Sequence, residues 1–319
     1  MVGLVGIFTS AVGPIVAIAA AGYVLATIKK VDPDPLNTAV VYVLAPALVF
    51  HSLAVSELAA DTLARVAAGV VLFTGGMWLV AEITGRITGH REPFLSALVL
   101  VASFGNTGNL GVPVSDFAFG PVGRQTAVLF LSVQAVLMYT HGVYVASRSG
   151  GSAGLAGVKR VMFLPLVYAV IAALLARSVN VVPPADSGPM EALQLVGDAA
   201  IPVMLLILGI QLARTDTDAA VAKSWAGTAL KLGVAPIIGV GVALVVGFEN
   251  PTVARVFILE TAMPAAVTPV ILVVEFAGDE QLDGVSVPEF VSTAVLVTTL
   301  LGIPALTGLI ALLRAGVIV

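Results

Sequence analysis

The stretch 103-SFGNTGNLGVPVS-115 decides the fold, because it lies inside an apolar segment of membrane-spanning length. Gly105, Gly108, Gly111 and Pro113 weaken or remove helical backbone at close intervals, so the segment cannot form one continuous helix. Backbone groups that leave a helix find no water in the hydrocarbon of a bilayer. The break is therefore expected to be buried in protein or to line a cavity that a ligand or water enters.

The composition is that of an integral membrane protein. Hydrophobic residues make up 59% of the 319 residues, charged residues make up 11%, and the mean hydropathy is +1.07. The net charge of -4, without basic clusters, gives no indication of nucleic acid as a partner. There are no cysteines, and the three histidines are too far apart for a metal-ligand motif. Neither a metal site nor a cofactor is predicted.

Ten segments are long and apolar enough to cross a bilayer, since a spanning helix needs about 20 mostly apolar residues. The predicted fold class is an all-α polytopic membrane protein with ten transmembrane helices. The predicted spans are residues 5–28, 35–54, 63–85, 93–118, 123–146, 161–180, 190–213, 223–248, 252–277 and 287–313.

The basic residues of the links predict the orientation. With the N-terminus outside, nine lysines and arginines lie in inner links and five lie at the outer ends of spans. Basic residues favour cytoplasmic loops, so both termini are predicted to be extracellular, in a multi-pass protein of the cell membrane. The inner set is Lys29, Lys30, Arg86, Arg91, Arg148, Lys159, Arg160, Arg214 and Lys223, and the outer set is Arg65, Arg124, Arg177, Arg255 and Arg314.

A polar link at residues 147–160 divides the ten spans into two sets of five. The predicted units are therefore a first five-helix repeat at 1–146, a cytoplasmic link at 147–160, and a second repeat at 161–319. Three prolines of the first half recur in the second half at an offset of 156 residues, namely Pro33, Pro46 and Pro113 against Pro189, Pro202 and Pro269. Five spans per unit place the two units in opposite orientations, as in many secondary transporters.

The repeat predicts that span 9 is broken as span 4 is. Pro264 and Pro269 stand five residues apart in TAMPAAVTPV, and two broken helices would meet near the bilayer midplane. Half-helix N-termini carry a partial positive charge, so the crossing favours an anion. The bland alternatives are a simple kink at the prolines and polar side chains that only join neighbouring helices. The candidate substrate-binding residues are Asn106, Thr107, Asn109, Pro113, Pro264, Thr268 and Pro269.

Other polar residues lie within the predicted spans. Charges inside a span are costly and are functional candidates by default, although structural ion pairs and snorkelling are the alternatives. A histidine near a span end is either a packing residue or a proton-coupling group, and a glutamine in mid-span either joins helices or lines a polar pathway. The candidates for coupling or a pathway are His51, Gln134, Asp198, Lys231 and Glu260.

Three segments resemble the auxin efflux carrier family, which includes plant PIN-type carriers and prokaryotic malate and malonate carriers. They are GNTGNLGVPV in span 4, LVGDAAIPVMLLILGIQLA in span 7 and TAMPAAVTPVILVVEFAG in span 9, and the resemblance extends from Gly3 to Leu313. It implies two inverted five-helix units with crossed fourth and ninth helices, a fold similar to those of sodium–proton antiporters and bile-acid symporters. It also implies that Asn106 and Thr107 receive a substrate carboxylate. The large inner loop of long PIN-type carriers and their charged support residues in span 3 have no clear match.

The leading hypothesis is a secondary transporter that moves a small organic anion by alternating access. The resemblance implies an elevator mechanism, in which spans 1, 2, 6 and 7 form a scaffold and spans 3–5 and 8–10 move. Proton or sodium coupling and a homodimer are left open. The alternative is a sodium-coupled symporter or sodium–proton exchanger of similar fold. An intramembrane enzyme is less favoured, because no nucleophile–base or metal-ligand constellation is found in the spans.

Overall fold

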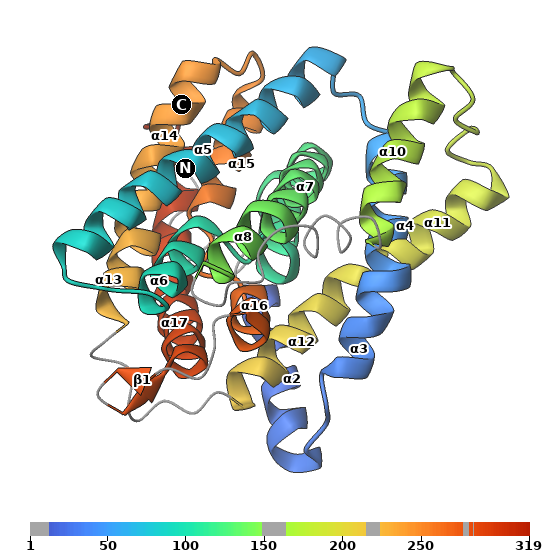
Figure 1. The fold of residues 1–319 in the computed structure, drawn as a ribbon. Helices are drawn as coiled ribbons and strands as arrows, with labels where there is room; N and C mark the ends of the chain where they lie inside the picture. The colour runs from blue at the N-terminus through green and yellow to red at the C-terminus, as the bar shows by residue number, and fades with distance from the viewer. Residues whose placement is uncertain (1–12, 149–163, 215–223, 277–280, 283) are drawn as a thin grey trace.

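The computed structural model describes residues 13–148, 164–214, 224–276, 281–282 and 284–319, which are almost entirely helical (Figure 1). In chain order the elements are α2 (Gly13–Lys29), α3 (Asp34–Ala39), η2 (Val40–Leu44), α4 (Ala45–Ala54), α5 (Ala60–Ile87), α6 (Phe94–Ser103), η3 (Thr107–Gly111), α7 (Val112–Leu137), η4 (Met138–Gly142), α8 (Val143–Ala146), α10 (Pro165–Ser178), α11 (Gly188–Asp198), α12 (Ala200–Arg214), α13 (Trp225–Ala229), η5 (Leu230–Val234), α14 (Ala235–Val246), α15 (Pro251–Thr261), α16 (Thr268–Phe276), β1 (Gln281–Leu282), β2 (Val285–Ser286) and α17 (Val287–Arg314). The η elements are single π-helical turns inside longer helices, and β1 and β2 form a short antiparallel hairpin.

Six helical segments in the described part of the chain are long and apolar enough to cross a membrane, which confirms the polytopic class. Shorter apolar helices, α2, α6 and α10, occupy three of the other predicted spans, and the pair α15 and α16 occupies span 9. The first residues of span 1 and most of the predicted link 147–160 lie outside the described residues. The ten-span inverted repeat stays a prediction. The six long segments are Asp34–Ala54, Ala60–Ile87, Thr107–Ala146, Gly188–Arg214, Trp225–Val246 and Val287–Arg314.

Spans 4 and 9 are each interrupted, but the interruption in span 4 does not lie at Pro113. Helix α6 ends at Ser103, and helical backbone resumes with η3 at Thr107. Pro113 is the second residue of α7 and lies one turn after helical backbone resumes at Thr107, whereas Pro269 lies in the first turn of α16. The two prolines therefore follow the breaks.

The helices form two groups (Figure 1). In one group α2 packs along α12, and α4 packs against α10 and α11. In the other, α5 packs against α6, α7 and α14, α15 packs against α7 and α14, and α16 packs against α17. Each group thus combines helices from both halves of the sequence. Both broken helices belong to the second group.

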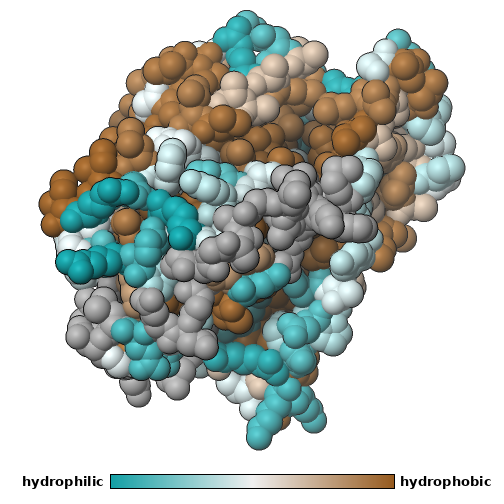
Figure 2. All heavy atoms as spheres, in the orientation of Figure 1, coloured by the Kyte–Doolittle hydropathy of each residue, from teal (hydrophilic) through white to brown (hydrophobic). Residues whose placement is uncertain are grey.

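Much of the outer surface is apolar, as expected where lipid chains replace water. Figure 2 shows hydrophobic residues spread over the upper part of the molecule and hydrophilic residues gathered mainly toward its lower end. Large exposed side chains include Ile87 on α5, Ile237 and Val245 on α14, and Leu301 on α17. This surface places the long helices in the bilayer.

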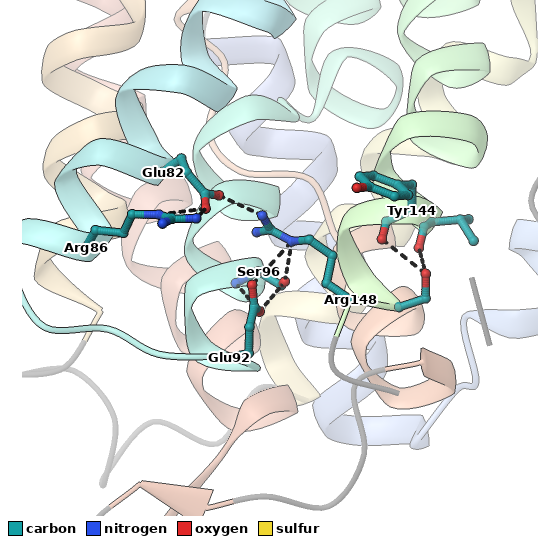
Figure 3. A network of polar contacts seen from close by, with 8 residues as sticks. Glu82, Arg86, Glu92, Ser96, Tyr144 and Arg148 are labelled. Atoms are coloured by element: carbon teal, nitrogen blue, oxygen red, sulfur yellow. Dashed lines mark hydrogen bonds and ion pairs between the residues drawn. The ribbon is translucent and has the colours of Figure 1, made fainter. Parts of the chain in front are cut away.

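Arg148 joins the ends of three helices of the second group (Figure 3). Its guanidinium lies 2.8 Å from a carboxylate oxygen of Glu82 on α5 and 3.2 Å from one of Glu92, in the link before α6. Glu82 also pairs with Arg86 at 2.7 Å, and Ser96 donates to Glu92. Glu82, whose side chain is only 12% exposed, is thus held by two ion pairs rather than by solvation alone.

Candidate functional site: the crossing of the two broken helices

The two breaks face each other and pair as a short antiparallel ladder. Gly105 and Ala265 form an isolated β-bridge. The N–H of Asn106 donates to the Pro264 carbonyl at 2.7 Å, and the N–H of Ala266 donates to the Phe104 carbonyl at 3.0 Å. Each break therefore satisfies part of the backbone that the other leaves free, as a buried interruption in a membrane protein requires.

Two side chains complete this pairing. Gln134 on α7 donates through Nε2 to the Gly105 carbonyl and to Thr107 Oγ1, both at 2.8 Å, and its Oε1 accepts from the Gly105 N–H at 3.3 Å. On the other side, Thr298 Oγ1 on α17 accepts from the Ala265 N–H at 3.1 Å. The mid-span glutamine singled out in the sequence is thus a clamp on the first break. Nothing in the sequence pattern distinguished Thr298 from the other threonines of its helix.

Replacing Thr298 with valine should lower the free energy of unfolding by about 1–3 kcal/mol, because the shape is kept while the Ala265 N–H loses its acceptor in a buried site. Thermal unfolding of the purified protein in detergent measures the change. Thr299→Val is the matched control, since Thr299 is also buried and its hydroxyl donates to Val295 of its own helix. Equal losses in the two variants would contradict the role of Thr298 at the break.

A cavity of about 200 Å³ adjoins the ladder. A cavity of this volume has room for an anion of a few carbon atoms. Its lining combines residues of the two helix groups, so the cavity lies between them. The polar side chains in its described lining are Asn37, Asn106, Thr107, Asn109, Gln134, Tyr139, Gln211 and Thr268.

The electrostatics of this cavity come from amides, hydroxyls and helix ends. No charged side chain belongs to its described lining. The backbone in the lining is 105–109 and 266–268, where the second half-helix of each broken span begins, and neither α6 nor α15 contributes. The first N–H groups of a helix lack partners within it and carry a partial positive charge. Both half-helix N-termini therefore face one cavity, which favours a negatively charged group there.

Asn106 is a buried polar side chain of the described lining that has an unused donor. It is 6% exposed, and its Nδ2 has no hydrogen-bond partner in the described structure. A buried amide without a partner is costly, so the donor is well placed for a ligand to satisfy.

The structure separates the other sequence candidates. Thr107, Asn109, Thr268 and Gln134 line the cavity with Asn106. Pro113 and Pro269 are buried in the helices behind it, Pro264 is buried in the second break, and none of the three belongs to its described lining. The candidates for coupling or a pathway also lie away from the lining, apart from Gln134. They are His51, Asp198, Lys231 and Glu260.

Lys231 and Glu260 are fully buried behind the breaks, at 0% and 1% exposure. Lys231 Nζ donates to the Ala102 carbonyl at 3.5 Å and lies 5.7 Å from the centre of the Phe73 ring. Glu260 Oε1 accepts from Ser115 Oγ at 2.7 Å, and its Oε2 has no partner. The two charges interact electrostatically, but no ion pair within 4.0 Å joins them in the described residues.

Asp198 belongs to an ion-pair cluster between the two helix groups. Arg124 on α7 pairs with Asp116 at 2.9 Å and also with Asp198 at the end of α11. His51 on α4 lies within electrostatic reach of Asp198 and Arg124. Asp198 is therefore a member of a structural ion pair, and its partner is Arg124.

On the other side the cavity adjoins a wider vestibule of about 470 Å³. The two spaces share Asn37, Gln211, Val267 and Ile271. The vestibule is also lined by Asp34, Arg214 and Glu289, which follow or precede links of the predicted inner set. The vestibule therefore lies between the crossing and the end of the molecule that carries these links.

Comparison with known proteins agrees with this architecture. The family described as membrane transport protein matches residues 7–160 and 153–310. An uncharacterized transporter of Methanothermobacter thermautotrophicus is 27% identical over 278 residues, which are 87% of this chain and 90% of its own length. A protein of Rhizobium meliloti, provisionally named as a malonate transporter, is 25% identical over 297 residues, or 88% and 87% of the two chains. An uncharacterized transporter of Methanocaldococcus jannaschii is 23% identical over 252 residues, or 77% and 80%.

The apolar helices and the family match define the chain as a multi-pass membrane transporter. It belongs to the auxin efflux carrier family, as the residues of spans 4, 7 and 9 indicated. The transporter class argues against an enzyme.

Proposed function

We propose that this protein is a secondary transporter that moves a small organic anion across the cell membrane, with a substrate carboxylate bound at the crossing of the broken helices. The observation that carries the proposal is the single cavity onto which both half-helix N-termini open, lined by Asn106, Thr107, Asn109 and Thr268 and by no charged side chain among the described residues. The unpartnered Nδ2 of Asn106 is the donor for the carboxylate. The name of the Rhizobium meliloti relative supports a short dicarboxylate such as malonate as a substrate.

Alternating access is the mechanism proposed for this site. The group of α2, α3, α4, α10, α11 and α12 would be the scaffold, and the group that holds both broken helices would move. The packing of each group and the position of the cavity between them support this division. We further propose the two inverted repeats at 1–146 and 161–319, extracellular termini and a cytoplasmic link at 147–160. A homodimer is part of the same proposal.

Uptake into proteoliposomes tests the proposal. The full chain should take up labelled malonate or another small carboxylate from a panel, and Asn106→Ala should reduce uptake by about tenfold or more, because a buried hydrogen bond to a charged group is lost. Asn109→Ala should have a smaller effect, since Asn109 is only partly buried. Ser132→Ala is the control, because its buried hydroxyl bonds within its own helix. Unchanged transport in Asn106→Ala and Asn109→Ala would contradict the site.

The second candidate function is a sodium-coupled symporter or a sodium–proton exchanger of similar fold. Glu260 favours it, as a buried carboxylate at the crossing. Exchange of sodium for protons by the proteoliposomes, without any organic anion, would select this function.

A further inference from the structure

Lys231 and Glu260 are the buried charged residues next to the proposed anion site. Lys231 lies behind Gly105 and Glu260 lies behind Gly111, near the two ends of the segment 105–111. A Cβ built at Gly105 would lie 3.3 Å from Lys231 Nζ, and Gly105 itself lines the cavity. A Cβ built at Gly111 would lie 2.2 Å from Glu260 Oε2. The Lys231 ammonium therefore lies directly behind the cavity wall. The Glu260 carboxylate, on α15, lies beside Gly111, further from the cavity along span 4.

Neither group is fully partnered by the protein. An ammonium has three donors, and Lys231 has one long hydrogen bond to the end of α6 and a contact with the Phe73 ring. Glu260 has one hydrogen bond, from Ser115, and a free Oε2. Within the described part of the chain no third titratable group acts on either of them. The opposite charges of Lys231 and Glu260 thus compensate each other in a buried place. Each side chain can still form at least one more hydrogen bond.

The balance changes when an anion enters. With the cavity empty, the ammonium and the carboxylate sum to zero. A carboxylate bound beside Gly105 adds one negative charge near Lys231, and an uncompensated buried charge is strongly unfavourable. A proton on Glu260 offsets the charge of this one carboxylate group, and the free Oε2 is the oxygen that can hold it.

We propose that Lys231 supplies the counter-charge for the bound anion and that Glu260 takes up one proton when the anion binds, so that one proton travels with each anion. The inference rests on the proposed function. The proton comes from water on the side of binding and returns to water on the side of release, and no covalent bond to the substrate forms. Anion and proton then promote each other's binding, because linkage between two ligands is reciprocal. Lys231 acts from behind the wall and is a positioning charge.

The test uses the full chain in proteoliposomes with labelled malonate. Glu260→Gln should keep malonate exchange at equal concentrations on both sides, yet lose accumulation driven by a pH gradient and lose the pH dependence of binding. Lys231→Met should weaken malonate binding by about tenfold or more. Glu57→Gln and Lys29→Met, at exposed positions, should behave as the unmodified protein.

A direct measurement covers the case in which a variant does not fold. Malonate added to the unmodified protein in weakly buffered detergent solution should make the medium more alkaline, and Glu57→Gln should do the same. Malonate exchange without proton uptake would overturn the inference and leave the proposed function standing. So would gradient-driven accumulation that persists in a folded Glu260→Gln. Failure of the unmodified protein to exchange any carboxylate would overturn both.

Discussion

Replacing Gln134 with leucine is expected to abolish transport and to lower thermal stability by several degrees. The side chain makes three hydrogen bonds to the first break, two with Gly105 and one with Thr107. Leucine fills a similar volume and makes none, so the carbonyl and N–H of Gly105 lose their partners at a buried position. Each unsatisfied group costs about 1–3 kcal/mol, and a transport site displaced by this rearrangement loses its geometry. Uptake per folded molecule and the melting temperature are the measurements.

Two variants on the same helix make the result specific. Ser132→Ala removes a buried hydroxyl that bonds only to the Val128 carbonyl of its own turn, and its effect should be small. Gln134→Glu keeps the acceptor for the Gly105 N–H but not the two donors, and it should remain strongly impaired. Normal uptake by Gln134→Leu would show that the crossing is held without this clamp.

Replacing Gly111 with alanine is the second change with a large expected effect. The added methyl would lie 2.2 Å from Glu260 Oε2 and 2.9 Å from its Cδ, so the buried carboxylate, which Ser115 holds through Oε1, has to shift. Overpacking of this kind destabilises by about 3 kcal/mol or less in most cases, and here it also displaces a buried charge. We expect loss of transport together with a clear fall in melting temperature.

Gly108→Ala is the matched comparison, because it adds the same methyl group within the same π-helical turn. Its nearest neighbour would be Leu131 Cδ1 at 3.5 Å, an ordinary contact, so stability should change little. Gly108 borders the cavity, and for that reason the comparison is made on melting temperature. Equal destabilisation by both alanines would mean that the loss of stability comes from the π-helical turn itself and not from the clash with Glu260.

The class of the protein and the approximate positions of the two helix breaks were predictable from the sequence. Composition and span length depend on the bilayer as solvent and can be read from residue types alone. The glycines and Asn106 marked a helix that could not continue, and the offset between Pro113 and Pro269 located a second one. The breaks lie before these prolines, since helical backbone has already resumed at Thr107 and at Thr268.

What the sequence could not supply was the partners across helices. Thr298 looks like any threonine of an apolar span until Ala265 is found opposite it. Lys231 and Glu260 are far apart in the chain, and their positions behind Gly105 and Gly111 depend on how span 8 and α15 pack. Their depth along a span was predictable from residue counts, whereas their neighbours were not.

The antiparallel ladder between the breaks has a consequence for the two faces of the membrane. Because Asn106 is bonded to Pro264 and Ala266 to Phe104, a displacement of one broken helix carries the other with it. In the proposed cycle the same donors would bind the carboxylate in the outward-facing and in the inward-facing state. Any difference in apparent affinity between the two faces would then arise from the stationary wall, where Asn37 and Gln211 meet the cavity. Substitutions of Asn37 or Gln211 should therefore change the apparent affinity for the substrate on one face of the membrane relative to the other. The hydrogen bonds from the crossing to the carboxylate should be unaffected.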